Sequence, residues 1–565
     1  MLKRPLLVFL FSTLVLPVFA QSGRLPAPAK NGMVVSSHYL ASEVGNEVLE
    51  QGGNAMDAAV ATAFALAVTL PRAGNIGGGG FIVYHGADGE VTSFNFREKA
   101  PLAATERMYL NRYDRIIDNS NHDGPLSVGV PGTVAGLALA HERLGSMPWE
   151  DLVAPSVSLA EEGFPFSWEM KPFVDMLSRR PKAYPSTSKV FLKPGNKAYE
   201  PGEILKQPDL AKTLDRIQKE GHDGFYKGET ARLLDQFMKV NGGLITEEDL
   251  AKYQAVEQAP IHGTYRGYDI YSMSPPSSGG IAVVTMLNIL EEYDLKEMGH
   301  NSAEYLHVVT ESMRRAFADR AEHVGDPLFN PEMPVERLIS KEHAAMLREG
   351  ISMNRASISD SSLFNNQPYE SEETTHFSVV DAEGNAVSLT YTLEYSYGSR
   401  LVVDGAGFLL NNEMGDFNAI PGVTNSSGRI GTPPNLIEPE KRMISSMTPT
   451  IVAKDGKPVI VIGAPGGRTI INTVLQVILN VIDHEMNIGE AVEAGRVHHQ
   501  WLPDRTVIEK WALSPDTRRL YELLGHTTTT RGSMGRAMGI YIDHDEGLIY
   551  GAADSRSFDG EAVGH

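Results

Sequence analysis

Residues 374–392 read TTHFSVVDAEGNAVSLTYT. Two runs rich in β-branched and aromatic residues, 376–381 and 385–393, flank a three-residue Ala-Glu-Gly turn, and this pattern predicts a β-hairpin. Pairing about the turn places Thr374 opposite Thr392, give or take a bulge. Spacing alone favours an ordinary cross-strand threonine pair, which is common in sheets. The stretch nevertheless brings two hydroxyl groups to one end of a predicted sheet.

The segment from Asp360 to Glu373 differs from its surroundings. It is rich in Ser, Asp, Asn, Gln, Pro and Glu and has few apolar residues, which is typical of an exposed loop. It leads directly into Thr374. A flexible acidic loop ending at a threonine is what self-cleavage requires, although ordinary loops have the same composition.

Strands and helices are predicted to cluster on both sides of this hairpin. After it, the pattern predicts strands at 448–453, 458–462, 538–543 and 547–551 and a helix at 468–483. Before it, helical and loop segments fill roughly 130–350, with helices at 133–144, 208–219, 280–293 and 302–321. Such clusters, without strict βαβα alternation, predict a layered α+β architecture.

The first hundred residues add two helices and a strand pair. Ser36 or Ser37 can cap a helix that ends at Gly52-Gly53, and Asn54 opens an alanine-rich helix to Val68. This second helix is apolar on nearly every side, which indicates burial in a core. Strands are predicted at 81–84 and 91–96.

A glycine-rich stretch, Gly74 to Phe81, precedes the first of these strands. A phosphate-binding loop would be followed by Gly-Lys-Ser/Thr, and the spacing is not that of a dinucleotide site. Close backbone packing or unusual dihedral angles explain the glycines better.

The N-terminus resembles a secretion signal. Lys3 and Arg4 precede an apolar run from Leu6 to Val15, and a small-x-small site ends at Ala20. The run is shorter than the roughly 20 residues of a membrane-spanning helix. We therefore expect a cleaved signal peptide, residues 1–20, rather than a membrane anchor, and a periplasmic or secreted mature chain.

Composition excludes several classes of function. The chain has no cysteine, so thiol nucleophiles, thiolate metal sites and disulfides are excluded. Its 50 basic and 71 acidic residues give a net charge of −21, which disfavours binding to nucleic acid. The adjacent pair His498-His499 lacks accompanying carboxylates at metal-ligand spacing, so we expect no metal site there.

Several motifs in order and spacing resemble the γ-glutamyltransferase family. They cover nearly the whole mature chain. So many motifs in the same order and spacing identify the family far more specifically than any one motif does. The motifs are Gly52 to Ala59, Gly74 to Phe81, Phe96-Arg97-Glu98, Gly129 to Thr133, Thr374 to Ser378, Thr390-Tyr391-Thr392, Asn411 to Phe417, Ser445 to Pro449 and Gly466-Gly467.

The resemblance implies an αββα sandwich of the N-terminal-nucleophile hydrolase type, with two stacked sheets between helix layers. It also implies cleavage of the Glu373–Thr374 bond. A large fragment, 21–373, and a small one, 374–565, would remain together as a heterodimer around one shared core.

The same resemblance assigns the residues that react. Thr374 would be the nucleophile, Thr392 would orient its hydroxyl, and Gly466 and Gly467 would present backbone N–H groups to the oxyanion. An alcohol needs a base to take its proton. Once freed, the α-amino group of Thr374 can be that base, because its reference pKa is about 7.7–8.0.

The donor substrate would be a γ-glutamyl amide such as glutathione, which carries a carboxylate and an ammonium on its α-carbon. By resemblance, Arg97 with Ser445 and Ser446 would hold the carboxylate. The ammonium would be held by Glu394, Glu413 and Asp416. Some family members carry Asn in place of Glu394 and Gln in place of Glu413, so the activity is not put in doubt.

The implied reaction forms a γ-glutamyl ester on Thr374, which water or the amine of an amino acid or dipeptide then cleaves, without metal or cofactor.

Two other functions stay open. One is an amidohydrolase of the same fold that acts on other acyl groups, such as a cephalosporin acylase or a poly-γ-glutamate-processing enzyme. The other is a binding protein that kept the fold.

A lid loop is expected between Asp416 and Ser445, with Asn425 to Gly428 at its middle.

Overall fold

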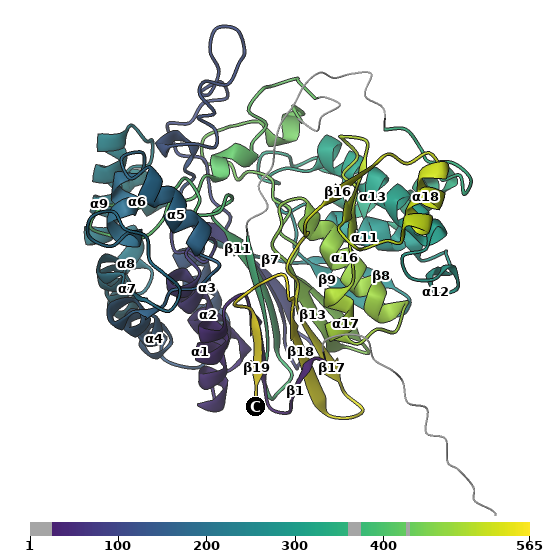
Figure 1. Ribbon diagram of the computed structural model, residues 1–565, viewed down its shortest axis with the longest axis horizontal. Helices are drawn as coiled ribbons and strands as arrows, with labels where there is room; N and C mark the ends of the chain where they lie inside the picture. Colours follow the sequence, from purple (N-terminus) through teal and green to yellow (C-terminus); the bar gives the residue numbers. More distant parts are fainter. Residues whose placement is uncertain (1–24, 360–373, 425–429) are drawn as a thin grey trace, which may run out of the picture.

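The computed structural model describes residues 25–359, 374–424 and 430–565. The predicted signal peptide, the acidic segment before Thr374 and the middle of the predicted lid loop lie outside these residues. Two seven-stranded sheets lie face to face between two layers of helices (Figure 1). This arrangement confirms the predicted αββα sandwich.

The first sheet carries the predicted hairpin at its centre, and every neighbouring pair of strands in it is antiparallel. In spatial order its strands are β19 (Glu561–Gly564), β2 (Met33–Ser36), β10 (Thr375–Val380), β11 (Ala386–Thr392), β3 (Gly79–His85), β4 (Val91–Asn95) and β7 (Val256–Gln258).

The second sheet is also antiparallel throughout. Its strands, in spatial order, are β1 (Ala27–Ala29), β18 (Leu548–Ala553), β17 (Met538–Asp543), β13 (Lys457–Gly463), β12 (Thr450–Lys454), β9 (Tyr268–Ser272) and β8 (Ile261–Tyr265). Strands β10 and β11 of the first sheet pack against β17 and β13 of the second.

The predicted register of the hairpin is confirmed. Thr375 pairs with Tyr391, so that Thr374 continues in line with Thr392. At the turn, Gly384 adopts a φ of 94°, a left-handed conformation that glycine tolerates best.

Two helices before the hairpin, α1 (Tyr39–Glu50) and α2 (Ala55–Thr69), pack against the outer face of the first sheet. Helix α2 is buried along its whole length, as its all-round apolar sequence predicts. A capping box formed by Asn54 and Asp57 starts it. The other helices on this side are α3 (Thr133–Leu144), α4 (Trp149–Glu162), α5 (Lys171–Arg179), α6 (Pro185–Phe191), α7 (Pro208–Glu220), α8 (Asp223–Tyr226), α9 (Gly228–Asn241) and α10 (Glu247–Lys252).

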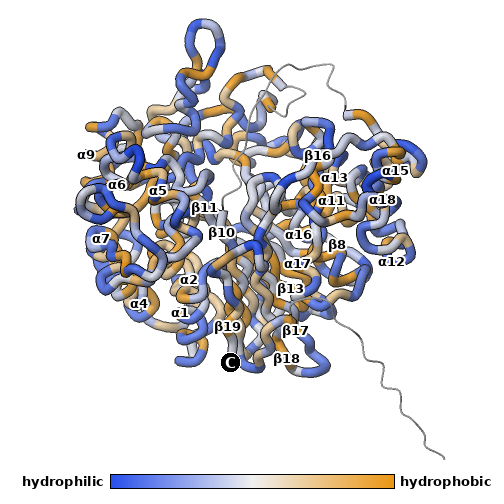
Figure 2. Tube along the Cα trace, in the orientation of Figure 1, coloured by the Kyte–Doolittle hydropathy of each residue, from blue (hydrophilic) through white to orange (hydrophobic). Residues whose placement is uncertain are grey.

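The second sheet is covered by α11 (Gly279–Leu290), α16 (Thr469–Ile482) and α17 (Ile488–Glu493). Helix α13 (Ala303–His323) packs outside α11. Figure 2 shows hydrophobic residues concentrated in the sheets and covering helices, and hydrophilic ones along the outer loops. The remaining elements are α12 (Leu295–Met298), α14 (Val335–Leu338), α15 (Lys341–Glu349), α18 (Pro515–Leu523), β5 (Phe164–Pro165), β6 (Ile204–Leu205), β14 (Val497–His498), β15 (Thr506–Glu509), β16 (Thr528–Arg531) and the 3-10 helices η1 (Pro125–Ser127), η2 (Glu413–Asp416) and η3 (Pro433–Asn435).

Two details of the sequence prediction are wrong. Ser36 and Ser37 do not cap α1, because residues 33–36 form β2 and the cap is His38, whose Nδ1 accepts from the Leu40 N–H. The region 130–350 also contains five strands that were not predicted, the two-residue strands β5 and β6 and the longer strands β7 to β9. These strands are five residues or fewer and their burial does not alternate cleanly, so the sequence offers little periodicity to detect.

The glycine-rich stretch serves close packing. A Cβ atom on Gly77, Gly78 or Gly80 would lie 2.0–2.4 Å from the backbone oxygens of Leu409, Thr392 and Thr390, respectively. None of the three has a positive φ. Of the two explanations considered for these glycines, close packing is therefore the one that applies.

No helix within residues 25–359, 374–424 and 430–565 is both long and apolar enough to cross a membrane.

Candidate active site

The two threonines predicted to face each other do so at the end of the hairpin. The Thr374 hydroxyl donates to Thr392 Oγ1 at 3.4 Å, and Thr374 is only 4% exposed. The backbone N–H of Glu394 also donates to Thr392 Oγ1, at 2.8 Å. This second bond fixes the Thr392 hydroxyl oxygen and so gives the Thr374 side chain a defined neighbour.

The predicted oxyanion glycines lie between β13 and α16. Gly466 has a φ of 139° and Gly467 a φ of 55°, conformations that favour glycine. The Gly466 carbonyl accepts from both the backbone and the hydroxyl of Thr469, which ties the glycine pair to the start of α16. Gly467 lines the same pocket as Thr374, whereas Gly466 is not among the lining residues.

Arg97 follows β4, and its buried guanidinium contacts several oxygen atoms. Its Nη1 lies 2.5 Å from Glu413 Oε2, and its Nη2 donates to Asp416 Oδ2 at 2.5 Å. The backbone carbonyls of Met443 and Ile444 accept from Nε and Nη2 at 3.4 and 3.1 Å. Arg97 was predicted to hold the carboxylate of the substrate, and Glu413 and Asp416 its ammonium. In the structure these three side chains contact one another.

The acidic residues come from three elements. Glu413 and Asp416 stand at the two ends of η2, and Glu394 follows β11 with a φ of 76°, an uncommon backbone conformation for a non-glycine residue. Glu98 is a further member that was not predicted. It is fully buried, and its Oε2 accepts from Arg97 Nη1 at 3.5 Å.

Crowding and burial shift the titration of this cluster. Burial raises the pKa of Glu413 well above its usual value, and the carboxylates of Glu98, Asp416 and Glu394 add to this against the lowering effect of Arg97. Burial likewise raises the pKa of Glu98 to about 7, although Arg97 opposes it. A cation bound beside these carboxyl groups would favour their ionised forms, so the cluster is suited to a cationic ligand group.

His122 borders this cluster and was not predicted. Its Nδ1 lies 3.4 Å from Glu394 Oε1, and its ring stacks on Tyr395 with centroids 5.0 Å apart. The carbonyl of His122 accepts from Asn412 Nδ2 at 3.2 Å, which ties its loop to the residue before η2.

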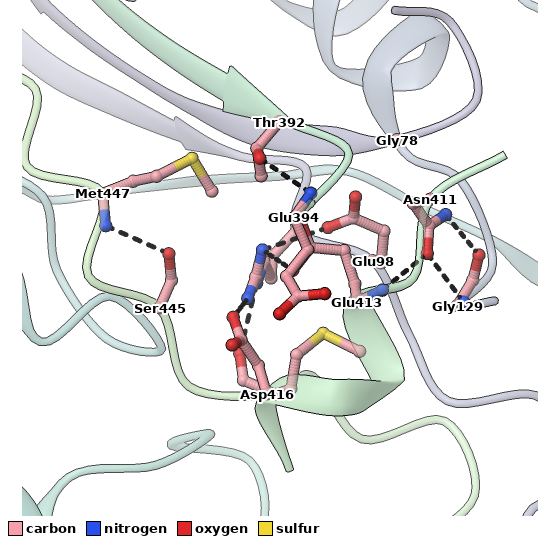
Figure 3. A network of polar contacts seen from close by, with 12 residues as sticks. Gly78, Glu98, Gly129, Thr392, Glu394, Asn411, Glu413, Asp416, Ser445 and Met447 are labelled. Carbon is pink, nitrogen blue, oxygen red and sulfur yellow. Dashed lines mark hydrogen bonds and ion pairs between the residues drawn. The ribbon is translucent and has the colours of Figure 1, made fainter. Parts of the chain in front are cut away.

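The serine pair is held by the turn that begins α11. Ser445 pairs with Ser277 in a parallel bridge, and its carbonyl accepts from the N–H and hydroxyl of Ser278 at 2.8 and 2.6 Å. Ser445 Oγ accepts from the Met447 N–H at 3.1 Å (Figure 3). The chain is thus fixed on both sides of the two serine side chains.

One pocket collects nine of the ten predicted residues. These are Arg97, Thr374, Thr392, Glu394, Glu413, Asp416, Ser445, Ser446 and Gly467. Two cations that were not predicted, Arg320 on α13 and Arg468 before α16, also line it. Arg468 directly follows the glycine pair, so its position along the chain could have indicated it. Arg320 lies 54 residues before Thr374 in an unremarkable helical segment, and no sequence signal indicates it.

The histidine pair 498–499 is engaged with protein groups. His498 Nδ1 accepts from Asn472 at 2.7 Å, and His499 Nε2 lies 3.2 Å from Asp504 Oδ1. Burial lowers the pKa of His498 to about 4. Within the described part of the chain, no group of three or more His, Asp or Glu side chains could hold a metal ion.

Comparison with known proteins gives consistent matches across the chain. A family model described as Gamma-glutamyltranspeptidase matches residues 41–564. The glutathione hydrolase proenzyme of Pseudomonas sp. (strain A14) is 44% identical over 575 residues, covering 100% of this chain and 99% of that protein. The glutathione hydrolase proenzyme of Escherichia coli (strain K12) is 45% identical over 549 residues, covering 96% of this chain and 93% of that protein.

Among solved structures, a cephalosporin acylase from Bacillus halodurans superposes with a TM-score of 0.85 and 27% identity, covering 99% of each chain. The similarity extends over both sheets and all helix layers, and it confirms the expected N-terminal-nucleophile hydrolase fold.

Proposed function

This chain belongs to the γ-glutamyltranspeptidase family, and we propose that it is a self-processing enzyme that cleaves the γ-glutamyl amide bond of glutathione and related compounds. The observation that carries this function is one pocket in which a threonine pair faces a buried cluster of one arginine and several carboxylates. Such a pocket joins a nucleophile to a binding site for an amino-acid group.

Self-cleavage before Thr374 supplies the base for the reaction. The Thr374 hydroxyl attacks the carbonyl carbon of Glu373, the peptide bond shifts to an ester, and water hydrolyses the ester. The amide nitrogen of Thr374 thereby becomes a free amine. That amine can take the proton of the hydroxyl on the same residue, and its reference pKa of about 7.7–8.0 suits the task near neutral pH.

The γ-glutamyl donor binds through the charges on its α-carbon. Glu394, Glu413 and Asp416 take the ammonium, and Arg97 with Ser445 and Ser446 takes the carboxylate. Because Arg97 already contacts Glu413 and Asp416, the donor inserts its zwitterion into an existing ion-pair network. The donor ammonium takes over part of the ion pairing that Arg97 provides to Glu413 and Asp416. The Arg97 guanidinium then turns toward the donor carboxylate.

Acyl transfer then follows in two steps. Thr374 Oγ attacks the γ-carbonyl while its amine takes the proton, and backbone N–H groups of Gly466 and Gly467 stabilise the oxyanion. The amine returns the proton to the leaving nitrogen, which departs and leaves a γ-glutamyl ester. Water or an acceptor amine attacks the ester by the same route in reverse, which gives ping-pong kinetics.

The two fragments, residues 21–373 and 374–565, stay together after cleavage. Support for this comes from both sheets, since each contains strands from before and after Thr374. Separating the fragments would break the strand pairing between them in both sheets, that of β10 with β2 and that of β12 with β9. We further propose that a signal peptide, residues 1–20, directs the chain to the periplasm or outside the cell.

The acylase alternative is tested with two chromogenic donors. The mature protein is assayed with γ-glutamyl-p-nitroanilide and with glutaryl-p-nitroanilide, which lacks the α-ammonium. We expect kcat/KM for the γ-glutamyl donor to be about 100-fold higher, because a glutaryl group leaves the acidic cluster without its cation. Equal or faster release from the glutaryl donor would assign the enzyme to other acyl groups. No release from either would favour a binding protein.

A further inference from the structure

Arg320 lies in the last turn of α13 and contacts the serine pair. It is only 7% exposed, yet it lines the pocket that contains Thr374. Its Nη2 donates to Ser446 Oγ at 3.1 Å, and its Nε donates to Ser278 Oγ at 2.8 Å. One guanidinium therefore contacts a predicted substrate-binding serine and the residue that holds the serine segment in place.

These contacts determine the direction of two hydroxyl groups. A serine hydroxyl has one proton to donate and can accept through its oxygen. Ser446 Oγ accepts from Arg320, so its proton remains for an acceptor in the pocket. Ser278 accepts from Arg320 and donates to the Ser445 carbonyl at 2.6 Å. Ser445 Oγ accepts from the Met447 N–H, so it too keeps its proton. Both members of the serine pair are set as donors.

Arg97 alone is a weak partner for a further carboxylate. Each of its three guanidinium nitrogens already contacts a protein oxygen, and the oxygens include carboxylates of Glu98, Glu413 and Asp416. A donor carboxylate placed beside Arg97 would therefore also approach these anions. A second cation, Arg320, which is bonded to Ser446 and lines the same pocket, offsets that repulsion, because charges in a partly buried site act over several ångströms.

We propose that Arg320 is a positioning residue for the α-carboxylate of the donor, acting through Ser446 and through its own positive charge. The inference rests on the proposed γ-glutamyl specificity and deepens it. Arg320 orients the Ser446 proton toward the carboxylate, and together with Arg97 it places the carboxylate between two guanidinium groups. Its effect is confined to donors that carry an α-carboxylate.

The test pairs an enzyme change with a substrate change. Arg320→Gln and Arg320→Lys are compared with wild type on γ-glutamyl-p-nitroanilide and on 4-aminobutyryl-p-nitroanilide, which differs only in lacking the α-carboxylate. For Arg320→Gln we expect kcat/KM on the γ-glutamyl donor to fall about 10- to 100-fold, mainly through KM, and to change less than about 3-fold on the other donor. Arg320→Lys should regain part of the loss because it keeps the charge.

Arg315→Gln is the matched control. Arg315 lies on the same helix and bonds to Glu311 and to the Leu347 carbonyl, but it does not line the pocket. It should leave the ratio of the two kcat/KM values unchanged even where it lowers stability. Maturation of every variant is followed by the appearance of two fragments on a gel. If Arg320→Gln does not mature, the ratio measured for Arg320→Lys decides.

An equal loss on both donors in the Arg320 variants would overturn the proposal, since a purely structural role predicts that result. Ser446→Ala gives a second check. It should reproduce part of the selective loss, and combining it with Arg320→Gln should lower kcat/KM by less than the product of the two single losses, because the two residues share one hydrogen bond. Failure of wild type on the γ-glutamyl donor would instead contradict the proposed function itself.

Discussion

At the scale of single residues, Thr392 is the contact that positions the Thr374 side chain. It accepts from the Glu394 N–H at 2.8 Å and from Thr374 at 3.4 Å, so it joins the proposed nucleophile to the backbone of Glu394. Removal of the Thr392 hydroxyl takes that neighbour from Thr374 but keeps every charged side chain that lines the pocket.

We therefore predict that Thr392→Ala lowers kcat about 10-fold or more while KM for the donor changes little, because a positioning hydrogen bond is lost and the binding groups remain. Thr392→Ser keeps the hydroxyl and should restore most of the rate. Steady-state kinetics on the mature fragments measure both values. A rise in KM at unchanged kcat would mean that Thr392 binds the donor instead.

At the scale of elements, the glycine-rich stretch shapes the site by letting strands approach. Gly78 stands directly before β3, and a Cβ there would lie 2.0 Å from the Thr392 carbonyl oxygen and 2.7 Å from Asn75 Oδ1. Asn75 in turn donates to the same carbonyl at 2.9 Å. The end of β11, where Thr392 lies, is thus fixed by a contact that only glycine permits.

Gly78→Ala should displace Thr392, block maturation and lower the apparent melting temperature, because backbone must move to relieve the overlap. Gly532→Ala is the control, since a Cβ at Gly532 meets nothing within 4 Å and its φ is not positive. Gel analysis and thermal melts report the outcome. If Gly78→Ala matured at the wild-type rate, the close packing would not be what positions Thr392.

The elements that the sequence predicts well are those with long, regular patterns. The hairpin of β10 and β11 and the apolar helix α2 were predicted with the observed register and burial, because a glycine turn and an all-round apolar run are local signals. Strands β7 to β9 were missed because short strands with mixed burial have no clear period.

The site was only partly predictable for a related reason. Resemblance to a family supplied its residues one by one, and nine of them line one pocket. Their mutual contacts could not be inferred, since the pairing of Arg97 with Glu413 and Asp416 arises where the end of β4 meets η2. Arg320 enters the pocket from α13, whose sequence shows nothing that separates it from other helices.

At the scale of the whole molecule, the segment before the proposed cleavage site is tied to the region after it. Glu311 on α13 accepts from Arg314, Arg315 and the Ser357 N–H at 3.2, 2.6 and 3.1 Å. Arg314 also pairs with Asp504, and Ser359 donates its N–H to Asp504 at 2.8 Å. Residues 357–359 are thus anchored on both proposed fragments.

Burial alone would raise the pKa of Glu311, but the bond from Ser357 and the charges of Arg314 and Arg315 prevail and lower it from 4.5 to about 2. A depressed pKa stabilises the folded state above pH 4.5, and this contribution is lost as pH falls toward 2. We predict that Glu311→Gln lowers stability at pH 7 by about 3 kcal/mol and flattens the decline between pH 4.5 and 2.

Urea unfolding of the mature protein at several pH values measures this effect. Glu248→Gln is the control, because Glu248 is largely exposed and pairs only with Lys252 one helical turn away, an interaction worth about 0.5 kcal/mol or less. Equal effects of the two substitutions at pH 7 would show that the Glu311 network contributes no more than a surface ion pair.

The central claim is that Thr374 cuts the chain and then acts as the nucleophile. The most direct test is the intact mass of the purified protein beside a Thr374→Ala variant, with N-terminal sequencing of any small fragment. We predict that the wild type yields a fragment that begins Thr-Thr-His and ends at His565, and that the variant stays uncut. A wild-type chain that folds and stays whole would contradict it, because Thr374 would then have no free amine to act as its base.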